Sequence, residues 1–419
     1  MRIVELTIPQ FDNYAINHPL GNYYQSSNYA LLMAENGFEY DLIGYLDDNN
    51  NIKAATLILY KKISMFSKYG YAPKGFLIDY YDLNLLRNFT NDLKEYYKHK
   101  NFAFIKINPE IAIGEINPKT HEISYNSNIR IKDYLLQMDY LKLKDNLYFE
   151  SLFPRFNAII PLKEFNINSI SKNTRNKVKK ATRKGLHFEI SDRRGIDILY
   201  EFIKDKKNKD VIYYKDYYNI FNKFDNIDLF LVNLDYNDFM LNSREAYSIE
   251  EEKNNNLNIM LSRSNNPHLV NKKMNSDKAL AAYKNDITLA TKGMNQFAKT
   301  YIAGALVMKH HNRINIVISG FDKNYGSFNP NHFLYYKILE YYKDKFAFAD
   351  LNGITGDFSK ESPYHGLNQF KIGFNPKLYE FIGEYDLIIN HKAYMSLYKN
   401  GTLAKEFNKV IEDEKQEDN

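Results

Sequence analysis

The chain of 419 residues contains no cysteine and no tryptophan. Without cysteine there are no disulfides, no thiol nucleophile and no thiolate metal site. The longest apolar runs, at 54–60 and 301–308, fall well short of the roughly 20 residues that a membrane-spanning helix needs. The first residues, MRIVELTIPQFDN, lack the apolar core and the basic start of a signal peptide. We therefore expect a cytoplasmic protein.

Several motifs that bind nucleotides or metals are missing as well. There is no GxxxxGK[ST] loop, no GxGxxG after a strand, no GxSxG elbow and no HExxH pair. His310 and His311 are adjacent, so on a strand we expect their side chains to point apart, which makes a poor metal pair. These absences favour an enzyme without a metal or a nucleotide cofactor, in which catalysis rests on positioning and electrostatics.

Apolar residues and aromatic rings are plentiful. Hydrophobic residues make up 44% of the chain and aromatic residues 15%, including 36 Tyr and 28 Phe. This composition indicates a folded globular protein, and the length indicates more than one lobe. Lys and Arg exceed Asp and Glu by 56 − 51 = 5, an excess that permits polyanionic partners without requiring them.

An internal repeat shows how the chain is organised. The sequence EYYKHKNFAFIKIN at 95–108 returns as EYYKDKFAFADLN at 340–352, and AATLIL at 54–59 returns as AGALVM at 303–308. Each copy places an apolar strand, a helix and a second short strand in the same order. Chance similarity in a Tyr-rich and Lys-rich chain is the alternative. We interpret the pattern as two copies of one αβ unit.

The segment before each second strand has the spacing of an amphipathic helix. Its apolar residues are Leu83, Leu86, Phe89, Leu93, Tyr96 and Tyr97 in the first copy, and Phe333, Tyr336, Ile338, Leu339 and Tyr342 in the second.

A segment of different character, 238–297, separates the two copies and is rich in Asn, Lys and Glu. The apolar residues of its second half follow steps of three and four, as in a coiled coil. They are Leu280, Tyr283, Ile287, Ala290, Met294 and Phe297. Asn265, Asn266 and Pro267 mark a turn. We expect two antiparallel helices of about 24 residues that project roughly 36 Å. An ordinary helical hairpin packed on the body is the alternative.

The densest basic cluster is SKNTRNKVKKATRKG at 171–185, which holds seven Lys or Arg residues and no acid. Arg175, Lys179 and Arg183 recur at every fourth position, so on a helix they form one cationic stripe. Such a stripe suits the binding of phosphates. A solvated helix face is the alternative.

A turn at 71–80, YAPKGFLIDY, is a second candidate site. Pro73 and Gly75 impose the turn, and Asp79 ends the apolar run that follows. Asp79 could act as a base or as an anchor for a substrate. It could equally cap the helix that begins near Asp82.

Lys371 is the third candidate, because Phe370, Ile372 and Phe374 surround it in the sequence. In a regular element its ammonium would have apolar neighbours and weak solvation, and it could stabilise a developing oxyanion. The alternative is a side chain that extends to the surface.

In their order along the chain, these segments resemble the FemABX family of peptidoglycan bridge-forming aminoacyltransferases. The matching segments are YYQSSNYALLMAENGFEYDLIGY (23–45), YAPKGFLIDY (71–80), TRNKVKKATRKG (174–185), LNGITGDF (351–358) and FKIGFNPKLYEFIGEYD (370–386). The resemblance implies an α/β (α+β) fold with two tandem lobes that are similar to GCN5-related N-acetyltransferases. The expected parts are a first lobe at 1–150, a second lobe at 151–237 and 298–400, a helical arm at 238–297 and an acidic tail at 401–419.

The resemblance also implies roles for individual residues. Lys371 and Phe370 match the family's catalytic FK motif, and Asp79 matches an acidic residue after the glycine turn. Substrate-binding positions are Arg175, Lys179, Arg183, Lys74 and Gly75, with Arg175 on the precursor diphosphate. Two departures stand out: Lys74-Gly75-Phe76 replaces the commoner Arg-Gly-Pro, and Met33 stands where several members have Lys.

The activity that the resemblance implies is transfer of an amino acid from aminoacyl-tRNA to the stem or bridge peptide of a peptidoglycan precursor. The precursor would be lipid II or UDP-MurNAc-pentapeptide, with no cofactor and no metal. This function also allows contact with the inner face of the membrane, and a homodimer or a heterodimer with related family members. The alternatives are a CoA-dependent N-acyltransferase of the same fold and a non-catalytic tRNA-binding or precursor-binding protein. The amino acid that is transferred stays open.

Overall fold

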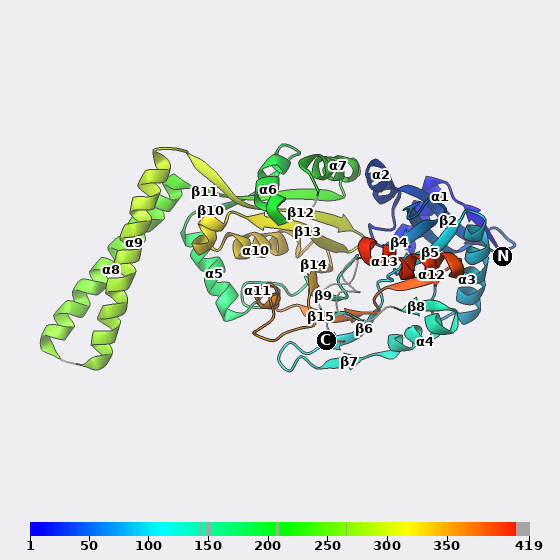
Figure 1. The fold of residues 1–419 in the computed structure, drawn as a ribbon. Helices are drawn as coiled ribbons and strands as arrows, with labels where there is room; N and C mark the ends of the chain where they lie inside the picture. Colours follow the sequence, from blue (N-terminus) through cyan, green and yellow to red (C-terminus); the bar gives the residue numbers. More distant parts are fainter. Residues whose placement is uncertain (143–144, 148–151, 207–208, 265, 408–419) are drawn as a thin grey trace.

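The computed structural model describes residues 1–419 except 143–144, 148–151, 207–208, 265 and 408–419. The described chain forms two mixed α/β lobes and a long helical hairpin that projects from one end (Figure 1). This confirms the predicted α/β fold, with two lobes and an inserted helical arm. Most of the predicted acidic tail lies outside the described residues. No helix in the described part of the chain is both long and apolar enough to cross a membrane.

The first sheet has seven strands, and all neighbours are antiparallel except β4 and β5. In spatial order the strands are β1 (Arg2–Glu5), β2 (Glu39–Leu46), β3 (Ile52–Lys62), β4 (Lys68–Ala72), β5 (Phe102–Ile107), β16 (Tyr385–Ile388) and β8 (Tyr140–Lys142).

The second sheet has nine strands, and β13 and β14 are its parallel pair. In spatial order the strands are β10 (Leu186–Ser191), β11 (Ile227–Asp235), β12 (Lys299–His310), β13 (Arg313–Phe321), β14 (Phe348–Ile354), β9 (Phe156–Pro161), β15 (Lys377–Phe381), β6 (Ala112–Ile116) and β7 (Ile123–Tyr125). Only Arg313–Asn315 pair with Phe348–Asp350, so β13 and β14 separate beyond that point.

The helices of the two lobes follow the repeat. The order β1, α1, α2, β2, β3, β4, α3, β5 returns as β10, α6, α7, β11, β12, β13, α10, β14. The helices are α1 (Ile8–Asn17), α2 (Ser27–Glu35), α3 (Leu83–Lys98), α4 (Arg130–Gln137), α5 (Lys172–Arg183), α6 (Gly195–Ile203), α7 (Val211–Asn222), α10 (Pro330–Tyr342), α11 (His365–Ile372), α12 (His391–Lys399) and α13 (Thr402–Glu406). The duplicated αβ unit predicted from the EYYK segments is therefore confirmed.

Strand pairing crosses the lobe boundaries expected from the sequence. β6 and β7 precede residue 150 but extend the second sheet, whereas β16 comes from the C-terminal part and joins the first sheet. A buried ion pair between Lys106 on β5 and Asp386 on β16, at 2.8 Å, accompanies the second crossing. The boundaries themselves stay a prediction.

A hydrophobic core is shared by the two lobes. It joins α1 and α2 of the first lobe to α6 and α7 of the second. Tyr23 and Phe221, for example, meet edge to face with their ring centroids 6.2 Å apart. Because this core includes residues from both lobes, the two lobes pack against each other as one body and are not independent domains joined by a linker.

The arm consists of α8 (Tyr236–Arg263) and α9 (Pro267–Met294), each of 28 residues and about 42 Å long at 1.5 Å per residue. It is inserted between β11 and β12. Asn266 caps α9, as expected of the predicted turn, and Asn265 lies outside the described residues. The middle of the hairpin is polar, because Asn254 donates to Ser276 and to Asp277 at 3.0 and 2.8 Å.

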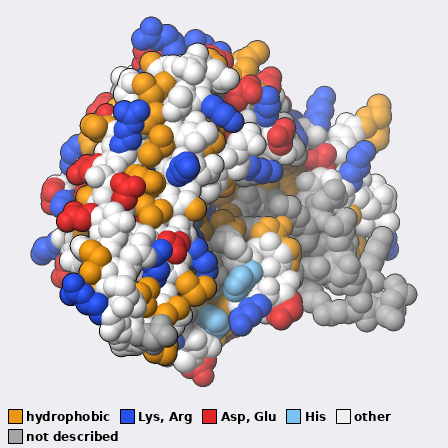
Figure 2. All heavy atoms as spheres, turned by 90° about the vertical axis from the view of Figure 1, so that its left-hand side faces the viewer, with side chains coloured by type: hydrophobic (Ala, Val, Ile, Leu, Met, Phe, Trp, Pro, Cys, Tyr) orange, Lys and Arg blue, Asp and Glu red, His pale blue; other side chains and the backbone are white. Residues whose placement is uncertain are grey.

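The predicted coiled-coil seam is correct only in part. Ala290 is buried, but Met294 and Phe297 are 43% and 60% exposed. Helix α9 ends at Met294, and Gly293 takes the inner position against the ring of Tyr236, where an added Cβ would overlap the ring. On the arm side of the molecule, the Lys and Arg side chains of the described residues are interspersed with acidic and hydrophobic ones (Figure 2).

Candidate functional site

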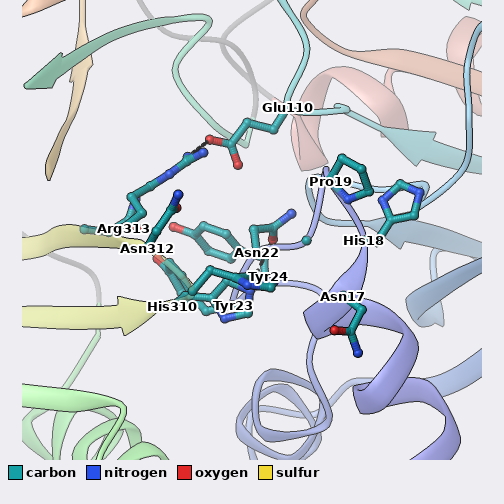
Figure 3. A pocket seen from close by; sticks show the side chains of 13 residues that line it. Asn17, His18, Pro19, Asn22, Tyr23, Tyr24, Glu110, His310, Asn312 and Arg313 are labelled. Carbon is teal, nitrogen blue, oxygen red and sulfur yellow. Dashed lines mark hydrogen bonds and ion pairs between the residues drawn. The ribbon is translucent and has the colours of Figure 1, made fainter. Parts of the chain in front are cut away.

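A cavity of about 340 Å³ lies between the two lobes. The connection between α1 and α2 forms one wall, the turn between β12 and β13 forms the other, and Glu110, after β5, lies above (Figure 3). Asn22 and Tyr24 line the first wall, and the Asn22 amide fixes that wall by donating to the carbonyl of Leu20 and accepting from the backbone N–H of Tyr24, both at 3.0 Å. We call this cavity the inter-lobe cleft.

An ion pair between Glu110 and Arg313 spans the cleft and joins the two lobes (Figure 3). Burial alone would raise the pKa of Glu110, but the positive charges of Arg313 and Lys74 outweigh burial and lower it. The charge of Glu110 in turn raises the pKa of Arg313. Both groups therefore carry their charges at neutral pH, and the cleft offers one cation and one anion to a ligand.

Asp350, on β14, lies behind the cleft and is 2% exposed. Its carboxylate accepts hydrogen bonds from the side chains of Asn157 and Asn315, at 3.2 and 3.1 Å, and from the backbone N–H of Asn352 at 2.7 Å. Burial raises its pKa. Two neutral amides and one backbone donor hold this carboxyl at the point where β13 and β14 separate.

The two adjacent histidines differ from expectation. Their ring centroids are 4.7 Å apart, because His311 has a left-handed backbone, with φ 51°, at the turn after β12. The expectation that they point apart is wrong. Burial, with the nearby charges of His311 and Arg313, lowers the pKa of His310 to about 4. Among the described residues no group of three or more His, Cys, Asp or Glu could hold a metal ion.

The Lys74-Gly75 turn follows β4 near the same cleft. Lys74 is 7% exposed, and its Nζ lies 5.1 Å from the centre of the Phe153 ring. Asn108 accepts a hydrogen bond from the Lys74 backbone N–H at 2.8 Å. Gly75 is required by close packing, since an added Cβ would lie 2.8 Å from Nε2 of Gln25. Gln25 therefore fixes the conformation of the turn, and the turn positions Lys74.

Asp79 is exposed and does not cap α3. Asp82 is the cap, and its carboxylate accepts from the backbone N–H of Leu85 at 2.9 Å. The alternative of Asp79 as a helix cap is therefore wrong. Asp79 instead accepts from the backbone N–H of Tyr81, and its charge acts on His18, which lines the cleft. Burial lowers the pKa of His18, and Asp79 opposes that effect.

Lys371, on α11, is 6% exposed, so the alternative of a side chain that extends to the surface is wrong. Its Nζ donates to the backbone carbonyl of Gly353 at 2.6 Å. Gly353 and Asp350 are three residues apart on β14, with the left-handed backbone of Asn352 (φ 62°) between them. The Lys371 ammonium and the amide of Asn315 therefore contact the same strand, β14, beside the opening between β13 and β14.

Aromatic rings and one histidine surround the residue next to Lys371. Phe370 packs against His332 and Tyr335 with ring centroids 4.9 Å apart in both pairs. Nε2 of His332 lies 3.3 Å from Nζ of Lys177 on α5. Burial and the Lys177 charge lower the pKa of His332 to about 4, so this imidazole is neutral at physiological pH.

The basic segment forms helix α5 as predicted, and its start packs against α11. The backbone N–H of Ser171 donates to the carbonyl of Gly373 at 2.9 Å. Lys179 and Arg183 are exposed and line a shallow hollow on α5, while Arg175 donates to Asn168 at 3.0 Å. Lys184, which follows α5 and is not part of the stripe, pairs through its Nζ with Asp286 of the arm at 2.9 Å.

The structure therefore divides the predicted site residues into two groups. Lys74 adjoins the inter-lobe cleft, because its carbonyl accepts from the side chain of Asn22, and Gly75 follows it in the turn. Asp79 acts on the cleft only through its charge on His18. The others lie on α5 and α11, which both pack against α10: Arg175, Lys179 and Arg183 on α5, and Phe370 and Lys371 on α11. The catalytic and binding roles assigned to all of these residues stay predictions.

Sequence reasoning missed Glu110, Arg313, Asp350 and His332. Asp350 gave a signal, since it is an acid within the otherwise apolar strand segment FAFADLN. Glu110 and Arg313 gave none, because a pair 203 residues apart is visible only after folding.

The family model of the FemAB family matches residues 6–399. The chain is 26% identical to a lipid II:glycine glycyltransferase of Staphylococcus epidermidis over 94% of each chain, and 24% identical to the aminoacyltransferase FemA of the same species over 97% of this chain and 99% of that one. Among solved structures it resembles FemX, with a TM-score of 0.72, 21% identity and coverage of 95% of this chain and all of that chain. The chain belongs to the FemAB family.

Proposed function

We propose that the protein is an aminoacyltransferase that moves an amino acid from aminoacyl-tRNA to the stem or bridge peptide of a peptidoglycan precursor. The match to the FemAB family over nearly the whole chain carries this proposal. The buried ammonium of Lys371, beside the opening between β13 and β14, supports it. The protein would work at the cytoplasmic face of the membrane on a lipid-linked or UDP-linked precursor, alone or with a related family member.

The reaction needs little chemistry from the enzyme. The neutral amine of the acceptor attacks the carbonyl carbon of the aminoacyl ester, a C–N bond forms and the C–O bond to the tRNA ribose breaks. The ribose hydroxyl leaves with one proton. An ester is already activated toward amines, so alignment and stabilisation of the oxyanion are sufficient.

Three groups of residues would have separate roles in this reaction. The inter-lobe cleft, with Glu110, Arg313 and the nearby Lys74, would hold the charged ends of the peptide acceptor. Lys371 would turn from the Gly353 carbonyl toward the oxyanion, with Phe370 shielding it from water. Arg175, Lys179 and Arg183 would contact phosphates of the precursor or of the tRNA.

Two helix N-termini disfavour the CoA-dependent alternative. Acetyltransferase folds that bind CoA hold its pyrophosphate on free N–H groups at a helix start. Helix α10 begins with Pro330, which has no N–H, and the start of α3 is occupied by the carboxylate of Asp82. We therefore expect acetyl-CoA to leave the melting temperature unchanged and a non-hydrolysable aminoacyl-tRNA to raise it.

The decisive experiment is incubation with purified lipid-linked precursor and a mixed pool of radiolabelled aminoacyl-tRNAs. Label in the precursor peptide would identify donor and acceptor together. Binding of both substrates without any label would instead favour the non-catalytic binding protein.

A further inference from the structure

The turn between β3 and β4 carries two large apolar side chains with almost no cover. Met65 is 85% exposed and Phe66 is 80% exposed, the two highest values among the large hydrophobic side chains of the described residues. The next value is 67%, at Phe224. Neither side chain contributes to the hydrophobic cores of the lobes. These two exposed side chains therefore lower the solubility of the protein without stabilising its core.

The backbone that presents these side chains is held in place. The N–H groups of Ile63 and Ser64 both donate to the carbonyl of Ser67, at 2.9 and 3.2 Å. The next residue, Lys68, donates its N–H to the carbonyl of Asn101 at 2.9 Å. The turn thus points its side chains outward from a braced hairpin.

Lysines flank the tip on both strands. Lys62 and Lys68 are direct partners across β3 and β4, an arrangement of like charges that destabilises a hairpin in water. Glu39 compensates Lys68 in part, at 3.6 Å, and Lys62 is exposed. An anionic surface would neutralise both lysines while it receives the two apolar side chains.

We infer that the Met65–Phe66 tip inserts into the headgroup region of an anionic lipid bilayer, with Lys62 and Lys68 on its phosphates. A protein partner fits less well, because a stable protein interface needs some 20–30 residues on each side and the tip offers two. Apolar side chains beside lysines are the usual composition of an interfacial membrane anchor.

The inference rests on the proposed function for its biological purpose. Phe66 precedes β4 and Lys74 follows it, eight residues further on, so about 26 Å of extended chain separates the tip from the turn beside the cleft. A precursor peptide on a lipid-linked sugar diphosphate stands away from the bilayer. A tip inserted among the headgroups would hold the inter-lobe cleft at a distance from the bilayer comparable to that of the precursor peptide.

The absence of tryptophan from the chain makes a direct test possible. Phe66→Trp introduces a single tryptophan at the tip, which can be excited selectively over the 36 tyrosines, and Phe297→Trp, 60% exposed at the base of the arm, is the matched control. With vesicles of phosphatidylglycerol and phosphatidylcholine, emission of Phe66→Trp should shift to shorter wavelength and be quenched by brominated lipid. The control should not change. Unchanged emission at the tip would overturn the inference. So would a shift without vesicles that grows with protein concentration, which would assign the tip to a second copy of the chain.

Partitioning measures the contribution of each group. The Met65→Ser/Phe66→Ser variant should lower the vesicle partition coefficient about 100-fold, about tenfold for each side chain. Lys62→Gln/Lys68→Gln should weaken binding to anionic vesicles and leave binding to pure phosphatidylcholine unchanged. Equal partitioning of all three proteins would contradict the inference.

Activity separates this inference from the proposed function. The tip variant should lose transfer to a precursor embedded in vesicles and keep transfer to a soluble UDP-linked or short-chain acceptor. If the wild-type protein transfers nothing to any acceptor, the proposed function fails, and the fluorescence result still decides whether the tip binds lipid.

Discussion

Replacing Lys371 with Met tests the proposed chemistry most directly. Methionine keeps the length and the apolar part of the side chain and removes the ammonium, whose Nζ lies 2.6 Å from the Gly353 carbonyl. Loss of one preorganised donor to an oxyanion lowers kcat about 100-fold to 1,000-fold, or about 2.7–4 kcal/mol. We expect a loss of this size in single-turnover transfer with both substrates saturating.

The effect of Lys371→Met on stability should be small, because two contributions oppose each other. The Gly353 carbonyl loses a charge-assisted hydrogen bond, which costs about 1–3 kcal/mol when the acceptor stays buried. Removal of a buried ammonium recovers a desolvation cost of similar size. We therefore expect a shift of only a few degrees in Tm, measured by thermal denaturation, and an unchanged Kd for the precursor.

The matched control is Lys337→Met on the neighbouring helix α10, where the ammonium pairs with Glu340 at 2.7 Å on the surface. This variant should keep the wild-type rate. If Lys371→Met turns over within threefold of wild type, the ammonium does not stabilise the oxyanion. A large fall in Tm with unchanged activity per folded molecule would instead show that Lys371 serves to stabilise the packing of α11 on β14.

Three further predictions concern the arm, the lobe interface and pH. Gly293→Ala places a methyl group against the Tyr236 ring and should cost about 1–3 kcal/mol in urea unfolding; an unchanged unfolding midpoint would contradict the close contact. Arg313→Met leaves the Glu110 charge buried without its partner and should cost about 3–5 kcal/mol, whereas adding Glu110→Gln should restore part of that loss; additive losses in the double-mutant cycle would contradict the pairing. With a pKa of about 4 against 6.5 in the unfolded chain, His332 makes the unfolding free energy fall as pH drops from 6.5 toward 4, and His332→Gln should flatten this dependence; an NMR titration midpoint near 6.5 would refute it.

Local patterns in the sequence were sufficient for the elements and for their duplication. The apolar spacing of α3 puts Leu86, Phe89, Leu93 and Tyr97 on one face, and these four residues are buried. The paired EYYK segments revealed the repeated order of strands and helices, because the order of elements is written along the chain. The predicted seam of the arm was wrong only at Met294 and Phe297, because the spacing of apolar residues does not show where a helix ends.

The residue types alone did not show whether each candidate side chain is buried or which group it contacts. Lys371 has apolar neighbours along the chain, but its burial depends on α11 packing beside β14, and only the fold decided between the two alternatives. Asp79 and Asp82 lie three residues apart, and which of them caps α3 depends on the backbone geometry of the turn.

Patterns along the chain were enough to predict the helices of the repeat and of the arm, the duplication and the family resemblance. Tertiary structure decided how β6, β7 and β16 are exchanged between the sheets, and it alone brought Glu110 to Arg313. The reason is physical: helix and strand periodicities are properties of neighbouring residues, whereas the burial and pairing of charges depend on contacts between segments far apart in the chain.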